Sequence, residues 1–372
     1  MHLTATSQCS PRIRPRLNDL DGREWVQATK TVLFQHGLGY SHPETRIERQ
    51  HPAPFSYRDA ERLIRLFSRT GEEVLDPFSG VGSTLKACAL SGRKGTGIEL
   101  SKTFCRLTRA RMKEEVEEPR ARADQTVLCG DSRALVAKLA DNRYSFILSS
   151  PPYWSILARA GQSQSTRYRK GSSPYGNDKR DFGTIEDYDE FVEELAIFVD
   201  SLKRVLQPKG YMAIMVADFR FGDTLYALQA DLIAALRQLN RTGSRRLVLQ
   251  GIKIIAQNHK KLYPYGFPTT YVPNIHHQYV LIFRNVVESD APIRPKSPSP
   301  GARGKRTAAH KRNAAHSTRA KPFRSKAKRV KPRRSMPKRA KPSRSAAKRS
   351  SAKSGSKRRG HADKAKDLRR KR

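Results

Sequence analysis

Short apolar runs alternate with amphipathic segments along residues 59–284, the pattern of an α/β domain. The strand-like runs fall at 73–75, 95–99, 126–129, 144–148, 211–216, 246–255 and 279–284. Helical spacing is found at 59–67, 84–90, 101–118, 133–140, 187–207 and 225–239. A Pro- and aromatic-rich connector at 260–277 precedes the last strand. We therefore predict a sheet flanked by helices, with a strap at 24–34 packed on its core.

A glycine-rich turn follows the first strand, Asp76-Pro77-Phe78-Ser79-Gly80-Val81-Gly82-Ser83-Thr84. Gly80 and Gly82 allow a tight turn and close approach of a ligand to the backbone. The second strand ends in Glu99, 19 residues after Gly80, near the spacing at which an acid meets ribose hydroxyls. A connecting turn and a solvated carboxylate are the alternatives. The combination favours a nucleotide-type site.

Asp131 follows the third strand, in Gly130-Asp131-Ser132. Its carboxylate is placed to accept a hydrogen bond from an exocyclic amino group such as that of adenine. It is also a typical cap for the helix predicted at 133–140. The two roles are compatible, and we expect both.

The fourth strand runs into Ser149-Ser150-Pro151-Pro152-Tyr153-Trp154. Each proline lacks an N–H and fixes φ, so the backbone must leave the sheet here. Two aromatic rings then stand at the carboxyl end of a strand, where ligands bind in open α/β sheets.

Two further segments flank these motifs. His51-Pro52-Ala53-Pro54-Phe55 is predicted to be extended and to hold the ring of Phe55 in place. Residues 155–181 are polar and basic and lack secondary-structure signals. Long loops of this kind are more often functional or disordered than simple connectors. We interpret 155–181 as a DNA-facing loop, with a flexible insertion as the alternative.

Charge divides the chain into unequal parts. The net charge is +40, and residues 291–372 hold 32 Lys and Arg against two acids. This region has almost no apolar bulk and repeats a ten-residue unit from Arg319, so we predict that it is disordered and binds phosphates without reading bases. The expected organisation is a loosely ordered lead-in (1–23), a folded domain (24–287) and a basic tail (288–372).

Some classes of protein are not indicated. The four cysteines have no C-x-x-C spacing, so the sequence predicts neither a metal site nor disulfides. No run approaches the length of a membrane span, and no signal peptide is evident. We expect no membrane partner and a cytoplasmic protein associated with the nucleoid, or a nuclear one in a eukaryote.

Taken together, the motifs resemble those of the S-adenosylmethionine-dependent DNA amino-methyltransferases. The pairing of Asp-Pro-Phe-x-Gly-x-Gly at 76–82 with Ser-Pro-Pro-Tyr at 150–153 carries the resemblance, which extends over about residues 24–285. It implies a Rossmann-like class I methyltransferase fold, a seven-stranded, mostly parallel sheet with one antiparallel strand. The basic region resembles the tails of histone-like proteins. No separate target-recognition domain is visible between Trp154 and Tyr211.

The resemblance also implies site roles. The cofactor S-adenosylmethionine is expected to contact Phe55, Asp76, Pro77, Phe78, Gly80, Gly82, Thr84, Glu99 and Asp131. The catalytic stretch is expected to be Ser150, Pro151, Pro152, Tyr153 and Trp154. In this scheme the Ser150 side chain and the Pro151 carbonyl accept hydrogen bonds from the target amine. Tyr153, and with it Trp154, stacks on a base flipped out of double-stranded DNA.

The predicted activity is methyl transfer to N4 of cytosine in DNA, because Ser rather than Asp or Asn opens the motif. Three alternatives stay open. They are an N6-adenine DNA methyltransferase, an RNA methyltransferase, and a histone-like architectural protein with an inactive methyltransferase domain.

Overall fold

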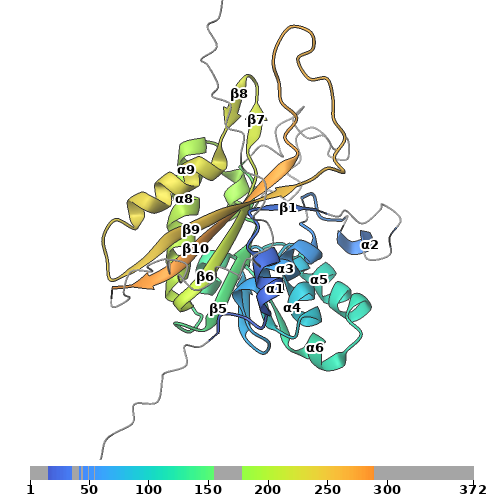
Figure 1. Cartoon of the computed structure of the whole chain (residues 1–372), viewed down its shortest axis with the longest axis vertical. Coiled ribbons are helices and arrows are strands. Elements are labelled where there is room, and N and C mark those ends of the chain that lie inside the picture. The colour runs from blue at the N-terminus through green and yellow to red at the C-terminus, as the bar shows by residue number, and fades with distance from the viewer. Residues whose placement is uncertain are drawn as a thin grey trace, which may run out of the picture. The chain divides into compact units, whose positions relative to one another are not determined.

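An eight-stranded sheet organises the part of the chain that the structure describes. The structure is a computed structural model and describes residues 16–35, 42, 45–48, 50–53, 55–154 and 178–288 (Figure 1). Most of the predicted lead-in, most of the predicted basic loop (155–177) and the predicted tail from 289 onward lie outside the described residues.

The strand order is β1-β9-β10-β6-β5-β2-β3-β4. The strands are β1 (Val32–Phe34), β2 (Glu73–Asp76), β3 (Lys94–Glu99), β4 (Gln125–Cys129), β5 (Tyr144–Ser149), β6 (Leu206–Val216), β9 (Arg245–Ala256) and β10 (His277–Val287). Strand β10 is antiparallel to both neighbours, and the other pairs are parallel. The predicted α/β fold is confirmed. The eighth strand is β1, which pairs with β9 at the edge where we predicted only a strap.

Helices cover both faces of the sheet (Figure 1). They are α1 (Gly22–Ala28), α2 (Thr45–Glu48), α3 (Tyr57–Phe67), α4 (Ser83–Leu90), α5 (Lys102–Glu115), α6 (Pro119–Ala123), α7 (Ser132–Val136), α8 (Tyr188–Ser201) and α9 (Leu228–Leu239). Short 3-10 turns occur at η2 (Phe182–Thr184) and η3 (Leu202–Arg204). Of the described helices, none is long and apolar enough to cross a membrane.

Several predicted helices were too long, and the pairing of strands explains two of them. The helix predicted at 187–207 ends at Ser201, because Leu206 already pairs with Tyr144 in the sheet. The helix predicted at 225–239 begins at Leu228, because a small hairpin of β7 (Phe219–Phe221) and β8 (Thr224–Tyr226) precedes it. Tertiary pairing overrides local helical pattern at both places.

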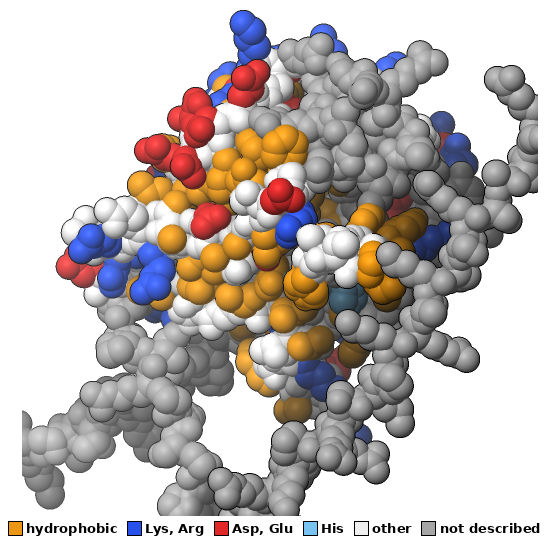
Figure 2. Space-filling model, turned by 90° about the horizontal axis from the view of Figure 1, so that it is seen from above, with side chains coloured by type: hydrophobic (Ala, Val, Ile, Leu, Met, Phe, Trp, Pro, Cys, Tyr) orange, Lys and Arg blue, Asp and Glu red, His pale blue; other side chains and the backbone are white. Residues whose placement is uncertain are grey.

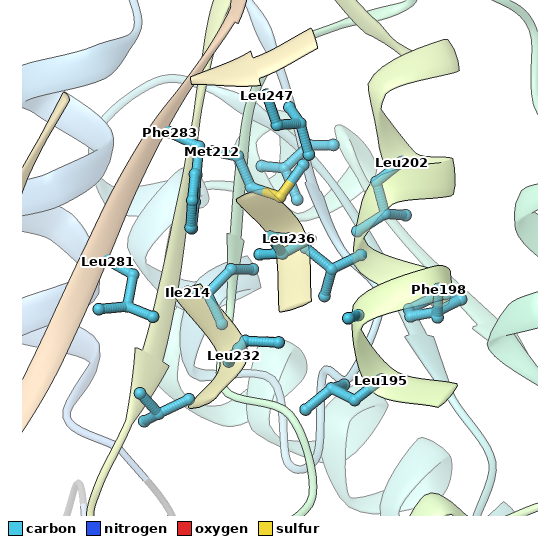
Figure 3. Packing of buried hydrophobic residues seen from close by; sticks show 14 of the residues in the cluster. Leu195, Phe198, Leu202, Met212, Ile214, Leu232, Leu236, Leu247, Leu281 and Phe283 are labelled. Atoms are coloured by element: carbon cyan, nitrogen blue, oxygen red, sulfur yellow. The ribbon is translucent and has the colours of Figure 1, made fainter. Parts of the chain in front are cut away.

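The core has two layers because side chains of a strand point alternately to opposite faces. In β6, Met212 and Ile214 pack toward α8 and α9, whereas Ala213 and Met215 pack in the cluster that includes α3. Figure 3 shows the first layer, with Leu195 and Phe198 of α8 and Leu232 and Leu236 of α9 facing the strands. Both faces of the sheet are therefore buried, as is typical of parallel sheets.

Strand register identifies one edge of the sheet as the functional edge. Ser149 at the end of β5 lies beside Ile214 near the end of β6. Val216 lies beside Tyr279 at the start of β10, and Ala256 at the end of β9 lies beside His277. The carboxyl ends of β5, β6 and β9 therefore meet at the same edge, together with those of β2, β3 and β4.

Candidate active site

A cleft opens at the carboxyl edge where β5 lies beside β2. The chain moves outward from β2 to β3 and β4 and then returns to the other side of β2 with β5, which makes this the topological switch point. The predicted residues that line the cleft are Pro77, Phe78, Gly80, Glu99, Asp131, Ser150, Pro151, Pro152 and Tyr153. The structure therefore brings the two sequence motifs together on one cavity.

Asp76 lies behind this cleft and organises it. The side chain is fully buried. It accepts hydrogen bonds from the hydroxyls of Thr84 (2.5 Å) and Ser149 (2.7 Å) and from the amide of Phe78 (3.0 Å). Burial raises the pKa of Asp76 to about 6. Asp76 thus ties β2, the start of α4 and the end of β5 together, and Thr84 shares this position behind the cleft.

The glycine turn has the close packing that its sequence predicts. Gly80 and Gly82 have φ of +53° and +78°, in the left-handed region. A Cβ on Gly82 would lie 2.5 Å from Cγ2 of Thr108. Thr108 also donates a hydrogen bond to the carbonyl of Gly80 (3.0 Å). Helix α5 therefore packs against the turn through Thr108. Gly82 allows this close packing and does not line the cleft.

Glu99 connects the turn to the next strand. Its carboxylate accepts hydrogen bonds from the amides of Gly80 (2.9 Å) and Ser101 (2.7 Å). Burial raises the pKa of Glu99 to about 7. The structure shows a direct contact between the turn and the acid, and the contact of Glu99 with ribose hydroxyls stays a prediction.

An ion-pair network that sequence reasoning missed supports the same turn. Arg111 is fully buried and donates to the Val81 carbonyl (3.3 Å) and the Ser83 hydroxyl (3.0 Å). It pairs with Glu48 (2.9 Å) and Glu115 (3.0 Å). The only sequence indication was an arginine among the apolar positions of the predicted helix at 101–118.

The segment at 51–55 contributes a different ring from the one predicted. Phe55 is buried in the core cluster of α3 and does not line the cleft, whereas His51 and Ala53 do. Nδ1 of His51 accepts a hydrogen bond from the Ala53 amide (3.3 Å), and burial lowers the pKa of His51 to about 4. His51 is therefore a neutral imidazole beside Gly80, where an added Cβ would lie 3.0 Å from its Nε2.

The Ser-Pro-Pro-Tyr turn forms the opposite wall. The Tyr153 hydroxyl oxygen accepts hydrogen bonds from the Ser150 side chain and from Nε2 of Gln278 (3.4 Å for the latter). Burial raises the pKa of Tyr153 to about 12, so its hydroxyl stays protonated. This wall presents hydroxyl and carbonyl acceptors and an aromatic ring rather than a charged base.

Trp154 faces the protein interior. Only 4% of its surface is exposed, and its indole N–H donates to the Glu186 carbonyl (3.1 Å). Its ring packs against Tyr188 of α8 and against Phe219 and Tyr226 of the β7–β8 hairpin, with centroids 5.3–5.9 Å apart. This position contradicts the predicted stacking of Trp154 on a base. Trp154 instead connects the turn to the hairpin.

Asp131 and Phe182, at the start of η2, line the remaining side of the cleft. Asp131 caps α7 by accepting from the Arg133 amide (2.9 Å), as predicted, and also lines the cleft. The Arg133 guanidinium lies over the Phe182 ring (4.9 Å to the centroid) and donates to the Arg180 carbonyl (2.8 Å). The end of the predicted DNA-facing loop therefore reaches the cleft.

No group of three or more His, Cys, Asp and Glu side chains with the geometry to hold a metal ion occurs within the described ranges. The cleft is lined by the half-buried carboxyl-bearing residues Glu99, Asp131 and Asp181 and by Arg180. Phe78, Tyr153 and Phe182 supply apolar surface.

Comparisons with known proteins show a similarity to DNA methylases. Residues 13–110 match the DNA methylase family N6_N4_Mtase. The orphan methyltransferase M.BamHII of Bacillus amyloliquefaciens is 31% identical over 114 residues, which are 28% of this chain and 43% of that protein. The type II methyltransferase M.MthZI of Methanothermobacter thermautotrophicus is 39% identical over 69 residues, 18% of this chain and 19% of that protein.

Among solved structures, a methyltransferase from Pyrococcus furiosus is 15% identical with a TM-score of 0.34, covering 62% of this chain and 83% of that one. The chain spans less than half the length of the curated relatives that it matches.

Proposed function

We propose that this chain is an S-adenosylmethionine-dependent DNA amino-methyltransferase. The observation that carries the proposal is the meeting of the glycine turn at 76–84 with the Ser-Pro-Pro-Tyr turn at 150–153 on one cleft. The family match at 13–110, which contains the glycine turn and Glu99, supports the same conclusion. Bound S-adenosylmethionine supplies an electrophilic methyl group on a sulfonium.

In this proposal the acidic side chains of the cleft hold the cofactor. Glu99 takes the ribose hydroxyls, and Asp131 accepts from the adenine amino group. Phe78 and Pro77 give the cofactor an apolar bed, and the backbone at Gly80 permits close approach. Asp76, Gly82 and Thr84 act from behind by holding the turn, since their hydrogen bonds and packing face the protein.

The other wall positions the target base. An exocyclic amine is a weak nucleophile because its lone pair is delocalised into the ring, so orientation supplies much of the catalysis. Ser150 Oγ and the Pro151 carbonyl accept hydrogen bonds from the amine, which directs its lone pair toward the methyl group. The Tyr153 ring stacks on the flipped base, and its hydroxyl holds Ser150 in place. As the N–C bond forms, the bond between the methyl carbon and sulfur breaks, and the surplus proton on the methylated nitrogen passes to water.

We further propose that the target is N4 of cytosine in DNA, because the motif opens with Ser150 rather than with Asp or Asn. The test is nucleoside mass spectrometry of DNA methylated by the purified chain, with Pro152→Ala as the inactive comparison. N4-methylcytosine is expected. N6-methyladenine as the sole product would refute the cytosine assignment but would still support the methyltransferase function. Duplex DNA is expected to outcompete structured RNA as acceptor.

The basic residues from 289 onward are proposed to anchor the enzyme on DNA phosphates. Thirty excess positive charges in residues 291–372 bind a polyanion through release of counterions. A chain ending at Glu288 is expected to lose most of the salt dependence of DNA binding and to retain its affinity for S-adenosylmethionine. Equal salt dependence in the two chains would refute the anchoring role.

A further inference from the structure

The connector between β9 and β10 projects from the functional edge. It leaves the sheet after Ala256 and returns at His277, and these two residues are paired in register. The amide of Gln257 donates to the His276 carbonyl (2.7 Å), which closes the stem. Figure 1 shows the connector extending from the same end of the sheet as the β7–β8 hairpin.

This connector carries exposed apolar side chains. The exposed fractions are 86% for Tyr271, 80% for Phe267 and 68% for Leu262, and Tyr263 and Tyr265 are more than 40% exposed. Single exposed apolar residues are ordinary, but a group of five on one loop marks an interaction site. Figure 2 looks onto this end of the molecule and shows hydrophobic side chains gathered in the middle of the face.

The loop holds its shape through its own polar groups. Asn274 exchanges two hydrogen bonds with the backbone of Tyr263 (2.8 and 2.9 Å). The amides of Thr269 and Thr270 donate to the Gly266 carbonyl (2.8 and 2.7 Å). Gly266 has φ of +71°, and an added Cβ would lie 2.3 Å from the Thr270 carbonyl oxygen. The aromatic rings are thus presented outward by a loop whose backbone is internally bonded.

Charge identifies the partner. Residues 257–276 contain no acid, and Lys260 and Lys261 stand at the base of the loop. Gln278, two residues beyond its end, donates to the hydroxyl of Tyr153 in the Ser-Pro-Pro-Tyr turn. A polyanion with apolar surfaces between its charges fits this combination, and a nucleic acid duplex has phosphates and base edges at such positions.

We propose that the loop at 260–274 contacts duplex DNA next to the target base, with Phe267 and Tyr271 against the bases and the two lysines on phosphates. The inference rests on the proposed methyltransferase function for its choice of DNA. It gives the chain a DNA-reading surface where no separate recognition domain is visible between Trp154 and Tyr211.

The first test replaces Phe267 with p-benzoylphenylalanine in the full chain and irradiates it with plasmid duplex DNA. A covalent adduct with DNA is expected at this position. The same photoreactive residue at Ile197, exposed on α8 toward the opposite edge of the sheet, is the control and is expected to give little adduct. A crosslink to a second copy of the chain in place of DNA would overturn the proposal.

The second test is the variant Phe267→Ser/Tyr271→Ser, compared with Ile197→Ser/Leu239→Ser. We expect at least a tenfold loss of methyl transfer to plasmid DNA in the loop variant, the effect of losing an aromatic contact with a base. The control variant is expected to match the wild type. Affinity for S-adenosylmethionine, measured by calorimetry, should be unchanged in both, which separates a lost DNA contact from misfolding.

The two hypotheses fail in different ways. If the photoreactive chain forms a DNA adduct at position 267 but the wild-type chain transfers no methyl group, the methyltransferase function is refuted and the DNA-contacting loop is supported. If the loop variant transfers methyl groups at the wild-type rate and the photoreactive chain forms no DNA adduct, the DNA contact of the loop is refuted and the methyltransferase function is supported.

Discussion

The two halves of the carboxyl edge differ in where they place their polar and apolar groups. At the ends of β2 and β3, Asp76 is fully buried and Glu99 is half-buried, and both accept hydrogen bonds from backbone or hydroxyl donors. Beyond the end of β9, the connector carries rings such as Phe267 into solvent, and the β7–β8 hairpin follows β6 at the same edge. We call the first the preorganised half, because its polar groups are already hydrogen-bonded within the protein. We call the second the projecting half, because its apolar side chains are exposed and would be covered only by a binding partner.

This difference matches the two ligands of the proposed reaction. The same small cofactor binds in every catalytic cycle. A preorganised cleft binds it without losing conformational entropy in ordering side chains. A DNA duplex is large and must be engaged and released, which suits projecting loops. Tyr153 joins the halves, because it lines the cleft and bonds to Gln278 beside the aromatic loop.

The largest effect is expected for Asp76→Ala in the preorganised half. The change leaves three donors without their acceptor, and each buried unsatisfied donor costs about 1–3 kcal/mol. We expect the free energy of unfolding to fall by at least about 3 kcal/mol and cofactor binding to be lost, as measured by denaturant titration and calorimetry. Asp223→Ala, at an exposed turn, is the control. Retention of cofactor affinity within twofold in Asp76→Ala would contradict this organising role.

A smaller loss is expected for Trp154→Ala, which acts on the projecting half. The change opens a cavity among Tyr188, Phe219 and Tyr226, and such truncations cost about 3 kcal/mol. Since Trp154 faces the hairpin and not the cofactor walls, methyl transfer to DNA should fall more than affinity for S-adenosylmethionine. Trp25→Ala, on exposed α1, is the matched control. An equal loss of both properties would show that the halves are not separable here.

The same division explains what could be predicted from the sequence. Gly80 and Glu99 could be placed at the cleft from the sequence because each belongs to a short local motif at a strand end, whereas Asp76, predicted to contact the cofactor, lies behind the cleft. Phe55 and Trp154 were misassigned, since an aromatic residue close to a proline in the sequence gives no information on which way its ring turns. His51 and Arg111 were missed because their roles depend on contacts between segments distant in sequence. The β7–β8 hairpin was not predicted, and its last two residues were assigned to the following helix, because its aromatic partners lie on other elements.

A pH effect of up to about tenfold is expected at Glu99. Burial places the pKa of its carboxyl at about 7, so raising the pH from 6 to 8 ionises it and strengthens it as an acceptor for ribose hydroxyls. Affinity for S-adenosylmethionine should therefore increase over this range. The amino group of the cofactor titrates in the same pH range. The quantity to compare is therefore the difference in S-adenosylmethionine affinity between wild type and Glu99→Gln, measured by calorimetry at each pH. Parallel pH profiles would refute the role of Glu99.

The smallest effect is expected for Arg220→Ala on the β7–β8 hairpin, assayed in a chain ending at Glu288 so that the tail does not dominate. Arg220 lies on the projecting half, where one phosphate contact contributes close to one unit of the slope of log K against log salt. We expect that slope to decrease by about 1 in duplex binding measured by fluorescence anisotropy. Arg237→Ala, exposed near the end of α9, changes the net charge equally and should leave the slope unchanged. If both variants shift the slope alike, the hairpin attracts DNA only through overall charge; if Arg220→Ala alone shifts it, the projecting half contacts the duplex.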